Sequence, residues 1–153
     1  SELDIGLIEI DTQNSSLIKE KLCDDELIVV TSDKNYKKEA FIDAIKKRWI
    51  LREIGSGTRE IFINYIGDIS KELDIFMQLQ DFEEIKTIVL NNPDTVTTLS
   101  KVIVKKELKE NKLFQIKLKN INLKREFYLI YHKEKSKTLL FETLIEFLKS
   151  RFI

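Results

Sequence analysis

The sequence has almost none of the residues that build disulfides and metal centres. Cys23 is the only cysteine among 153 residues, which excludes a disulfide within the chain and a cysteine-based metal cluster. Cys23 lies between Leu22 and two aspartates, and nearby carboxylates raise the pKa of a thiol. We therefore expect Cys23 to be a half-buried structural residue and not a reactive thiol.

Histidine is equally scarce. His132, the single histidine, ends a segment rich in tyrosine and phenylalanine. Without a second histidine or a cysteine partner, zinc ligation and serine–histidine hydrolysis lack the side chains that they need. No other acid–base or nucleophile–base set stands out. We expect no metal, no cofactor and no enzymatic activity.

The sequence also lacks an excess of one charge and a long apolar run. Twenty-six Lys and Arg balance 26 Asp and Glu, whereas a nucleic-acid-binding domain is usually basic. Any contact with DNA is therefore expected through another segment. No apolar run reaches the ~18 residues that span a bilayer, and no signal peptide is visible. We expect a cytoplasmic protein that does not enter a membrane.

Two of the four glycines lie in the most informative stretch, which runs from Trp49 to Glu60. An apolar strand leads into Gly55-Ser56-Gly57-Thr58, and a helix follows. The first N–H groups of a helix have no intrahelical acceptor, and the helix dipole adds roughly half a positive charge there. This pattern predicts a receptor for a small anion, with Ser56 and Thr58 as further donors. It also fits a plain turn with a good N-cap, and both interpretations stay open.

Strands and helices alternate along the rest of the chain. Apolar patterning predicts strands near residues 3–10, 26–31, 49–53, 75–79, 95–99, 113–118 and 126–131. It predicts helices near residues 40–45, from 58, after an Asp81 cap, over 102–108, and after a Ser136 cap. In the last helix we expect one buried stripe, formed by Leu140, Phe141, Leu144, Ile145, Leu148 and Phe152. This alternation indicates an α/β fold with a largely parallel sheet.

Six sequence segments occur in a characteristic order: residues 4–9, 22–30, 49–60, 85–89, 99–108 and 125–133. Together they resemble the effector-binding region of a LysR-type transcriptional regulator. The resemblance covers nearly the whole chain. It implies the periplasmic-binding-protein type II fold, an α/β fold of two lobes with mixed, mostly parallel sheets. Residues 1–24 and 127–153 would form lobe I, and residues 25–126 would form lobe II.

The same resemblance implies a function and an assembly. A small effector, such as an anion or a carboxylate, would bind between the lobes of a homodimer or tetramer. DNA would be bound only by a winged-helix domain that is absent from this chain. Lobe I would be incomplete, because the strand–helix segments that begin it in the family are not in the sequence. Pro93-Asp94-Thr95 replaces the family's Gly-x-Gly turn, so that loop must take another shape.

The expected effector-binding residues are Ser56, Gly57, Thr58, Arg59, Glu9 and Thr97. Arg59 could instead pair with Glu60 or Glu53. Glu9 follows the first strand, where α/β sites gather, and could select cationic or hydroxyl groups or merely cap a turn. Thr97 and Thr98 are strand threonines and weaker candidates. An alternative is a solute-binding or oxyanion-binding protein of the same fold, whose phosphate-binding members also use Ser-Gly-Thr turns.

Overall fold

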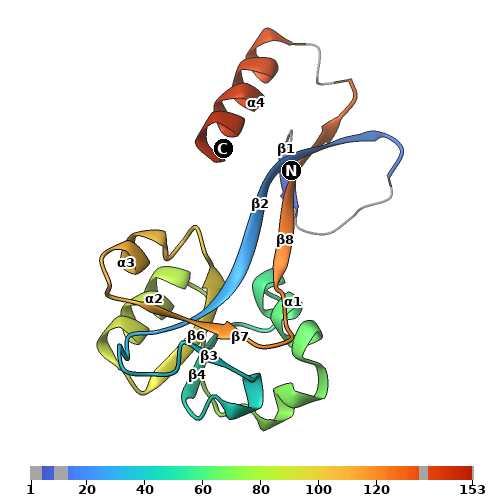
Figure 1. Cartoon of the computed structure of the whole chain (residues 1–153). Coiled ribbons are helices and arrows are strands. Elements are labelled where there is room, and N and C mark those ends of the chain that lie inside the picture. Colours follow the sequence, from blue (N-terminus) through green and yellow to red (C-terminus); the bar gives the residue numbers. More distant parts are fainter. Residues whose placement is uncertain (1–4, 9–13, 135–137, 153) are drawn as a thin grey trace. The chain divides into compact units, whose positions relative to one another are not determined.

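The computed structural model describes residues 5–8, 14–134 and 138–152 (Figure 1). The chain divides into two compact units. Unit 1 comprises Ser1–Asp25 and Lys124–Ile153, and unit 2 comprises Glu26–Leu123. Each unit has its own core, so each is described by itself.

Unit 2 is built on a mixed sheet. Its strands follow the order β3 (Glu39–Ala40), β7 (Phe114–Leu118), β2 (Leu17–Thr31), β6 (Thr95–Ser100), β4 (Arg48–Arg52) and β5 (Ile75–Leu79). Strand β2 belongs to this unit from Glu26 on, and its first part belongs to unit 1. Strand β4 runs parallel to β5 and β6, and β2 runs antiparallel to β6 and β7. The carboxyl ends of β4, β5 and β6 therefore meet at one edge of the sheet.

Two helices cover opposite faces of this sheet (Figure 1). Helix α1 (Gly57–Ile66) packs Phe62 against Trp49 and Leu51 of β4. Helix α2 (Phe82–Asn91) packs Ile85 against Ile50, the residue of β4 that points to the other face. Because both faces are covered, β4 is apolar at successive positions and not at alternate ones. The predicted α/β class is confirmed. The sheet is mixed and not largely parallel, because β2 runs antiparallel to both of its neighbours in this unit.

Unit 1 has a smaller sheet and one long helix. Strand β1 (Ile5–Ile8) pairs antiparallel with β8 (Lys124–His132), which also neighbours β2. Helix α4 (Leu139–Phe152) buries Phe141 and Ile145 against Leu129 and Tyr131. The predicted stripe on this helix is wrong in part, because Leu140 and Leu144 are 82% and 43% exposed. The expected Ser136 cap lies outside the described residues.

The helix predicted over residues 40–45 is wrong. The segment contains β3 and a single 3-10 turn, η1 (Ile42–Ala44). Ile42 and Ile45 are both buried, and a 3-10 turn places residues three apart on one side. One turn therefore satisfies the apolar spacing that suggested a longer helix.

Other boundaries differ more modestly from the prediction. Helix α1 begins at Gly57 and not at Thr58, and α3 is confined to Lys105–Lys109. Strand β2 begins at Leu17, well before the predicted residue 26. A second 3-10 helix, η2 (Gly67–Glu72), follows α1 and was not predicted. Strand β5 has the predicted bounds, and Asp81 caps α2 by accepting from the N–H of Glu83 at 2.6 Å.

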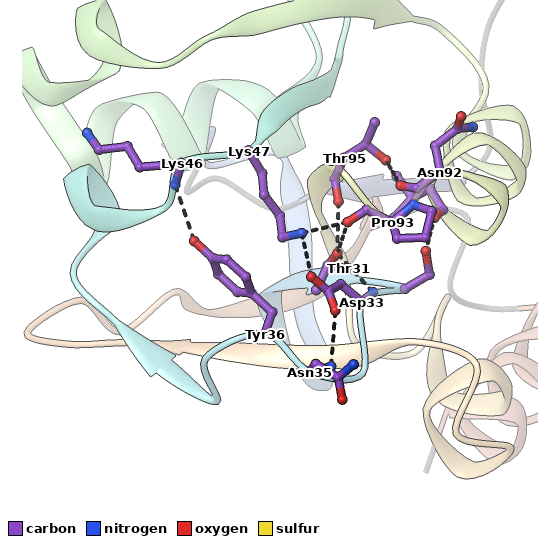
Figure 2. A network of polar contacts seen from close by, with 11 residues as sticks. Thr31, Asp33, Asn35, Tyr36, Lys46, Lys47, Asn92, Pro93 and Thr95 are labelled. Carbon is purple, nitrogen blue, oxygen red and sulfur yellow. Dashed lines mark hydrogen bonds and ion pairs between the residues drawn. The ribbon is translucent and has the colours of Figure 1, made fainter.

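A buried lysine stabilises unit 2 where β4 and β6 begin (Figure 2). The Nζ of Lys47 donates to Oδ2 of Asp33 at 3.0 Å and to the carbonyl of Pro93 at 2.6 Å. It also lies 4.5 Å from the centre of the Tyr36 ring. The Lys47 side chain is only 7% exposed, so its charge is matched inside the fold, as buried charges must be. The ion pair lowers the pKa of Asp33.

Candidate functional site

The predicted strand–turn–helix stretch forms at the carboxyl edge of the parallel strands. Strand β4 ends at Arg52, and the next N–H, that of Glu53, donates to the Leu79 carbonyl at 3.1 Å. The turn closes when the N–H of Ser56 donates to the Glu53 carbonyl at 3.2 Å. Gly55 has a φ of +92°, which favours glycine. The chain then enters α1.

The N-terminus of α1 has no side-chain cap. Ser56 is the N-cap residue and is 7% exposed, but its hydroxyl accepts no hydrogen bond from the first turn. Gly57 is exposed, and Thr58 is half-buried. A helix start favours an anion, because its first N–H groups lack intrahelical acceptors and the dipole is positive there.

One carboxylate already lies near this turn. Oε1 of Glu60 accepts from the N–H of Gly55 at 3.4 Å, and Glu60 is exposed. The bond is long, and water screens the charge of an exposed carboxylate. Glu60 therefore binds the Gly55 N–H only weakly, and this bond involves the turn and not the first residues of α1.

Arg59 is held beneath the first turn of α1. Its Nη1 donates to the Arg52 carbonyl at 2.9 Å and to Oε1 of Gln78 at 2.9 Å. The predicted pairing of Arg59 with Glu60 or Glu53 is wrong, because Glu53 forms its ion pair with Arg52 at 3.0 Å. With 9% of its surface exposed, Arg59 ties α1 to the ends of β4 and β5.

The two strand threonines point to opposite faces of the sheet. Thr98 shares a face with Val96, which packs in the cluster of α1, whereas Thr97 shares a face with Leu99 in the cluster of α2. Thr97 and Thr98 are 0% and 2% exposed. Neither hydroxyl has a hydrogen-bond partner among the described residues. The structure therefore places Thr98, and not Thr97, on the same face as Ser56–Arg59.

Two further features expected from the sequence, Glu9 and the turn at residues 93–95, are not among the residues gathered at the start of α1. Glu9 lies outside the described residues. The Pro93-Asp94-Thr95 turn lies where β6 begins, at the other end of the sheet from the start of α1. The N–H and the hydroxyl of Thr95 both donate to the Asn92 carbonyl, at 3.0 and 2.7 Å. Thr95 does not adopt a positive φ, as its β-branched side chain predicts.

Sequence reasoning missed Gln78. It lies beside Leu51 in the register of β4 and β5, and it supplies one of the two acceptors for Arg59. An exposed glutamine in a short strand carries no signal of its own. Only the pairing of the two strands brings it to the base of α1.

A cavity of about 420 Å³ opens at the opposite end of the same strands. Its lining includes Arg48 and Asp94, which form an ion pair. Ile45 and Leu73 also line it. None of the five predicted effector-binding residues that the structure describes borders this cavity, so the start of α1 is a separate feature.

Cys23 has the environment that the sequence predicts. It is half-buried, and burial raises the pKa of its thiol, followed by the charges of Asp25 and Asp24. Within the described residues, no cluster of His, Cys, Asp and Glu could hold a metal. No helix in this part of the chain is long and apolar enough to cross a membrane.

Comparison with known proteins identifies the family of this chain. The LysR substrate binding domain family matches residues 1–153. The chain belongs to this family. Because the match covers the whole chain, the chain is a LysR-type effector-binding domain. LysR-type proteins are a family of transcriptional regulators and not of enzymes.

One curated relative is the HTH-type transcriptional regulator CysL of Bacillus subtilis (strain 168). It is 26% identical over 155 residues, which cover 99% of this chain and 52% of CysL. The LysR-type chain thus spans about half the length of the curated regulators that it matches.

Solved structures share the fold. The regulatory domain of Synechocystis PCC6803 CcmR in complex with 2-PG superposes with a TM-score of 0.73. It is 20% identical, covering 97% of this chain and 73% of CcmR. A Clostridium perfringens protein, described as a phosphate ABC transporter substrate-binding protein with bound phosphate, gives a TM-score of 0.72. It is 19% identical, covering 95% of this chain and 72% of that one.

Proposed function

We propose that this LysR-type domain senses a small anion, such as a carboxylate, phosphate or sulfate, at the start of α1. The backbone N–H groups at Gly57 and Thr58 and the hydroxyls of Ser56 and Thr58 are the proposed donors. Thr98, on the same face of the sheet, is a further candidate in place of Thr97. Arg59 supplies positive charge beside them.

One observation carries this proposal: the N-terminus of α1 has no side-chain cap, although Arg59 lies buried beneath it. A helix start and a buried cation both favour negative charge. The bound phosphate and 2-PG of the two structural neighbours support the same ligand class.

The expected affinity follows from the number of donors. Charge-assisted hydrogen bonds contribute about 1.5–3 kcal/mol each before desolvation is subtracted. Two to four such bonds suit dissociation constants from roughly millimolar to micromolar. This range matches a metabolite sensor and not a tightly held cofactor.

The regulatory role extends the proposal beyond this chain. Residues 1–24 with 127–153, and residues 25–126, are proposed as the two effector-binding lobes. The ligand would shift a conformational equilibrium by its difference in affinity for the two states. In the cytoplasm, a homodimer or tetramer would pass that shift to a DNA-binding domain outside this chain.

The first test removes one donor. We expect Thr58→Val to weaken sulfate or phosphate binding by about tenfold or more, because one charge-assisted bond is lost. Calorimetric titration and the anion-induced rise in melting temperature measure this loss. Thr87→Val, at an exposed helical threonine of α2, is the matched control and should bind as the wild type does.

Two results would contradict the proposal. One is a Thr58→Val protein that stays folded and binds the anion with unchanged affinity. The other is a wild-type protein whose melting temperature no sulfate, phosphate or small carboxylate raises.

A further inference from the structure

Arg59 is a buried cation with no counter-ion among the residues that the structure describes. It is 9% exposed, and its Nη1 donates both protons to neutral oxygens, those of the Arg52 carbonyl and the Gln78 side chain. No carboxylate among the described residues forms an ion pair with it. A side chain buried this far is usually paired with an opposite charge, so the missing partner calls for an explanation.

The neighbouring acidic groups are engaged elsewhere. Glu53 pairs with Arg52, and the exposed Glu60 reaches back to the N–H of Gly55. The charges of Arg52 and Glu53 cancel, and solvent screens Glu60. Among these described groups, the charge of Arg59 and the helix dipole are the ones that remain unbalanced at the first turn of α1.

Gln78 accepts from Arg59 at a position from which a carboxylate would neutralise the guanidinium. It is exposed on β5, and its Oε1 lies 2.9 Å from Nη1. A glutamate has the same length and shape, and it would accept the same bond while adding a negative charge. The neutral amide thus orients the guanidinium without cancelling its charge.

We propose that Gln78 is a selectivity residue: its neutral amide positions Arg59 and leaves the positive charge available to an anion at the start of α1. This inference rests on the proposed function, because it assigns the electrostatic selectivity of the same site. Gln78 acts through Arg59 and need not touch the ligand. We therefore expect the site at the start of α1 to bind doubly charged anions more tightly than singly charged or neutral molecules.

The decisive variant is Gln78→Glu, which keeps the hydrogen bond to Arg59 and changes only the charge. We expect the dissociation constant for inorganic sulfate to rise about tenfold, because a carboxylate paired with Arg59 offsets the positive charge that attracts a dianion. The free energy of unfolding should stay the same or increase, since an ion pair replaces a neutral hydrogen bond. Calorimetric titration with sulfate and urea unfolding measure the two quantities.

Gln80→Glu is the matched control. Gln80 is exposed two residues further along and has no hydrogen bond to Arg59. The variant adds the same charge to the protein without pairing it with the guanidinium. Sulfate affinity should then change by less than about twofold, because solvent screens an unpaired surface charge. In an Arg59→Gln background, Gln78→Glu should have no larger effect than Gln80→Glu.

The outcomes separate this inference from the proposed function. If wild-type protein binds sulfate and Thr58→Val weakens that binding, but Gln78→Glu binds unchanged or more tightly, the role of Gln78 is overturned and the site survives. A Gln78→Glu protein that is less stable than wild type overturns the pairing with Arg59. If the wild type binds neither sulfate nor phosphate, the site and its selectivity residue are both rejected.

Discussion

At the scale of single residues, Glu20 joins three elements of unit 1. It lies on β2, accepts a hydrogen bond from the Tyr131 hydroxyl of β8, and accepts one from the Lys149 ammonium of α4 at 2.6 Å. The bond from Lys149, followed by that from Tyr131, lowers the pKa of Glu20 from its ordinary value of 4.5. Burial, followed by the bond to Glu20, raises the pKa of Tyr131 to about 12.

These shifts predict how stability depends on pH. A lowered carboxyl pKa stabilises the fold above the unfolded value and loses that effect as pH falls through the folded value. A raised tyrosine pKa stabilises the fold below about pH 10, and this stabilisation is lost as pH rises toward 12. We expect urea unfolding of unit 1 to show both losses, at acid and at strongly alkaline pH.

Glu20→Gln should flatten the acid side of this profile, because the titrating group is removed. Glu146→Gln, at an exposed glutamate of α4 without an ion pair to any described residue, should leave it unchanged. If both variants lose stability with acid as steeply as the wild type does, Glu20 is not the group responsible.

At the scale of elements, an aromatic contact in the core helps to attach α1 to the sheet. Phe62 is completely buried, and its ring centre lies 5.3 Å from that of Trp49 on β4. This packing, together with the bonds of Arg59, holds α1 in place without a side-chain cap from Ser56. Burial stabilises the helix independently of its first turn.

Phe62→Ala should lower the free energy of unfolding by about 3–5 kcal/mol, because it leaves a cavity in the core. Tyr65→Ala is the control on the same helix; Tyr65 is 55% exposed, so a loss of less than about 1 kcal/mol is expected. Trp49 is the only tryptophan, and its fluorescence reports unfolding directly. Equal losses in the two variants would show that α1 does not depend on the Phe62–Trp49 contact.

At the scale of the whole molecule, the two units have cores of different size. Among the described residues, twelve and eight buried side chains form the two clusters of unit 2, and five form the cluster of unit 1. Free energy of local opening follows buried apolar contact, so the units should differ in local stability and unfolding need not be a single two-state transition.

Hydrogen exchange tests this difference. We expect amides of β4 and β6 in unit 2 to exchange at least about tenfold more slowly than those of β1 in unit 1, which corresponds to 1.4 kcal/mol or more. Mass spectrometry of peptides from each unit measures these rates. Uniform protection along the described strands would mean that the units open together.

Much of the fold was predictable from local patterns. Strand β5, the Asp81 cap of α2 and the break at Pro93 follow from short-range spacing and backbone chemistry. The 3-10 turn at Ile42–Ala44 and the exposed Leu140 of α4 were not predictable. Apolar spacing shows which residues can be buried together, but the neighbouring elements decide how many of them are.

The candidate site divides in the same way. The sequence by itself determined the family, through the order of its six matching segments. It also determined the glycine turn that leads into α1, because a residue's φ and the unpaired N–H groups of a helix start depend on neighbouring residues. Only the tertiary structure decided that Gln78 reaches Arg59 and that Thr98, not Thr97, faces α1. Both facts depend on the register between strands, and a shift of one residue would reverse every side chain in a strand.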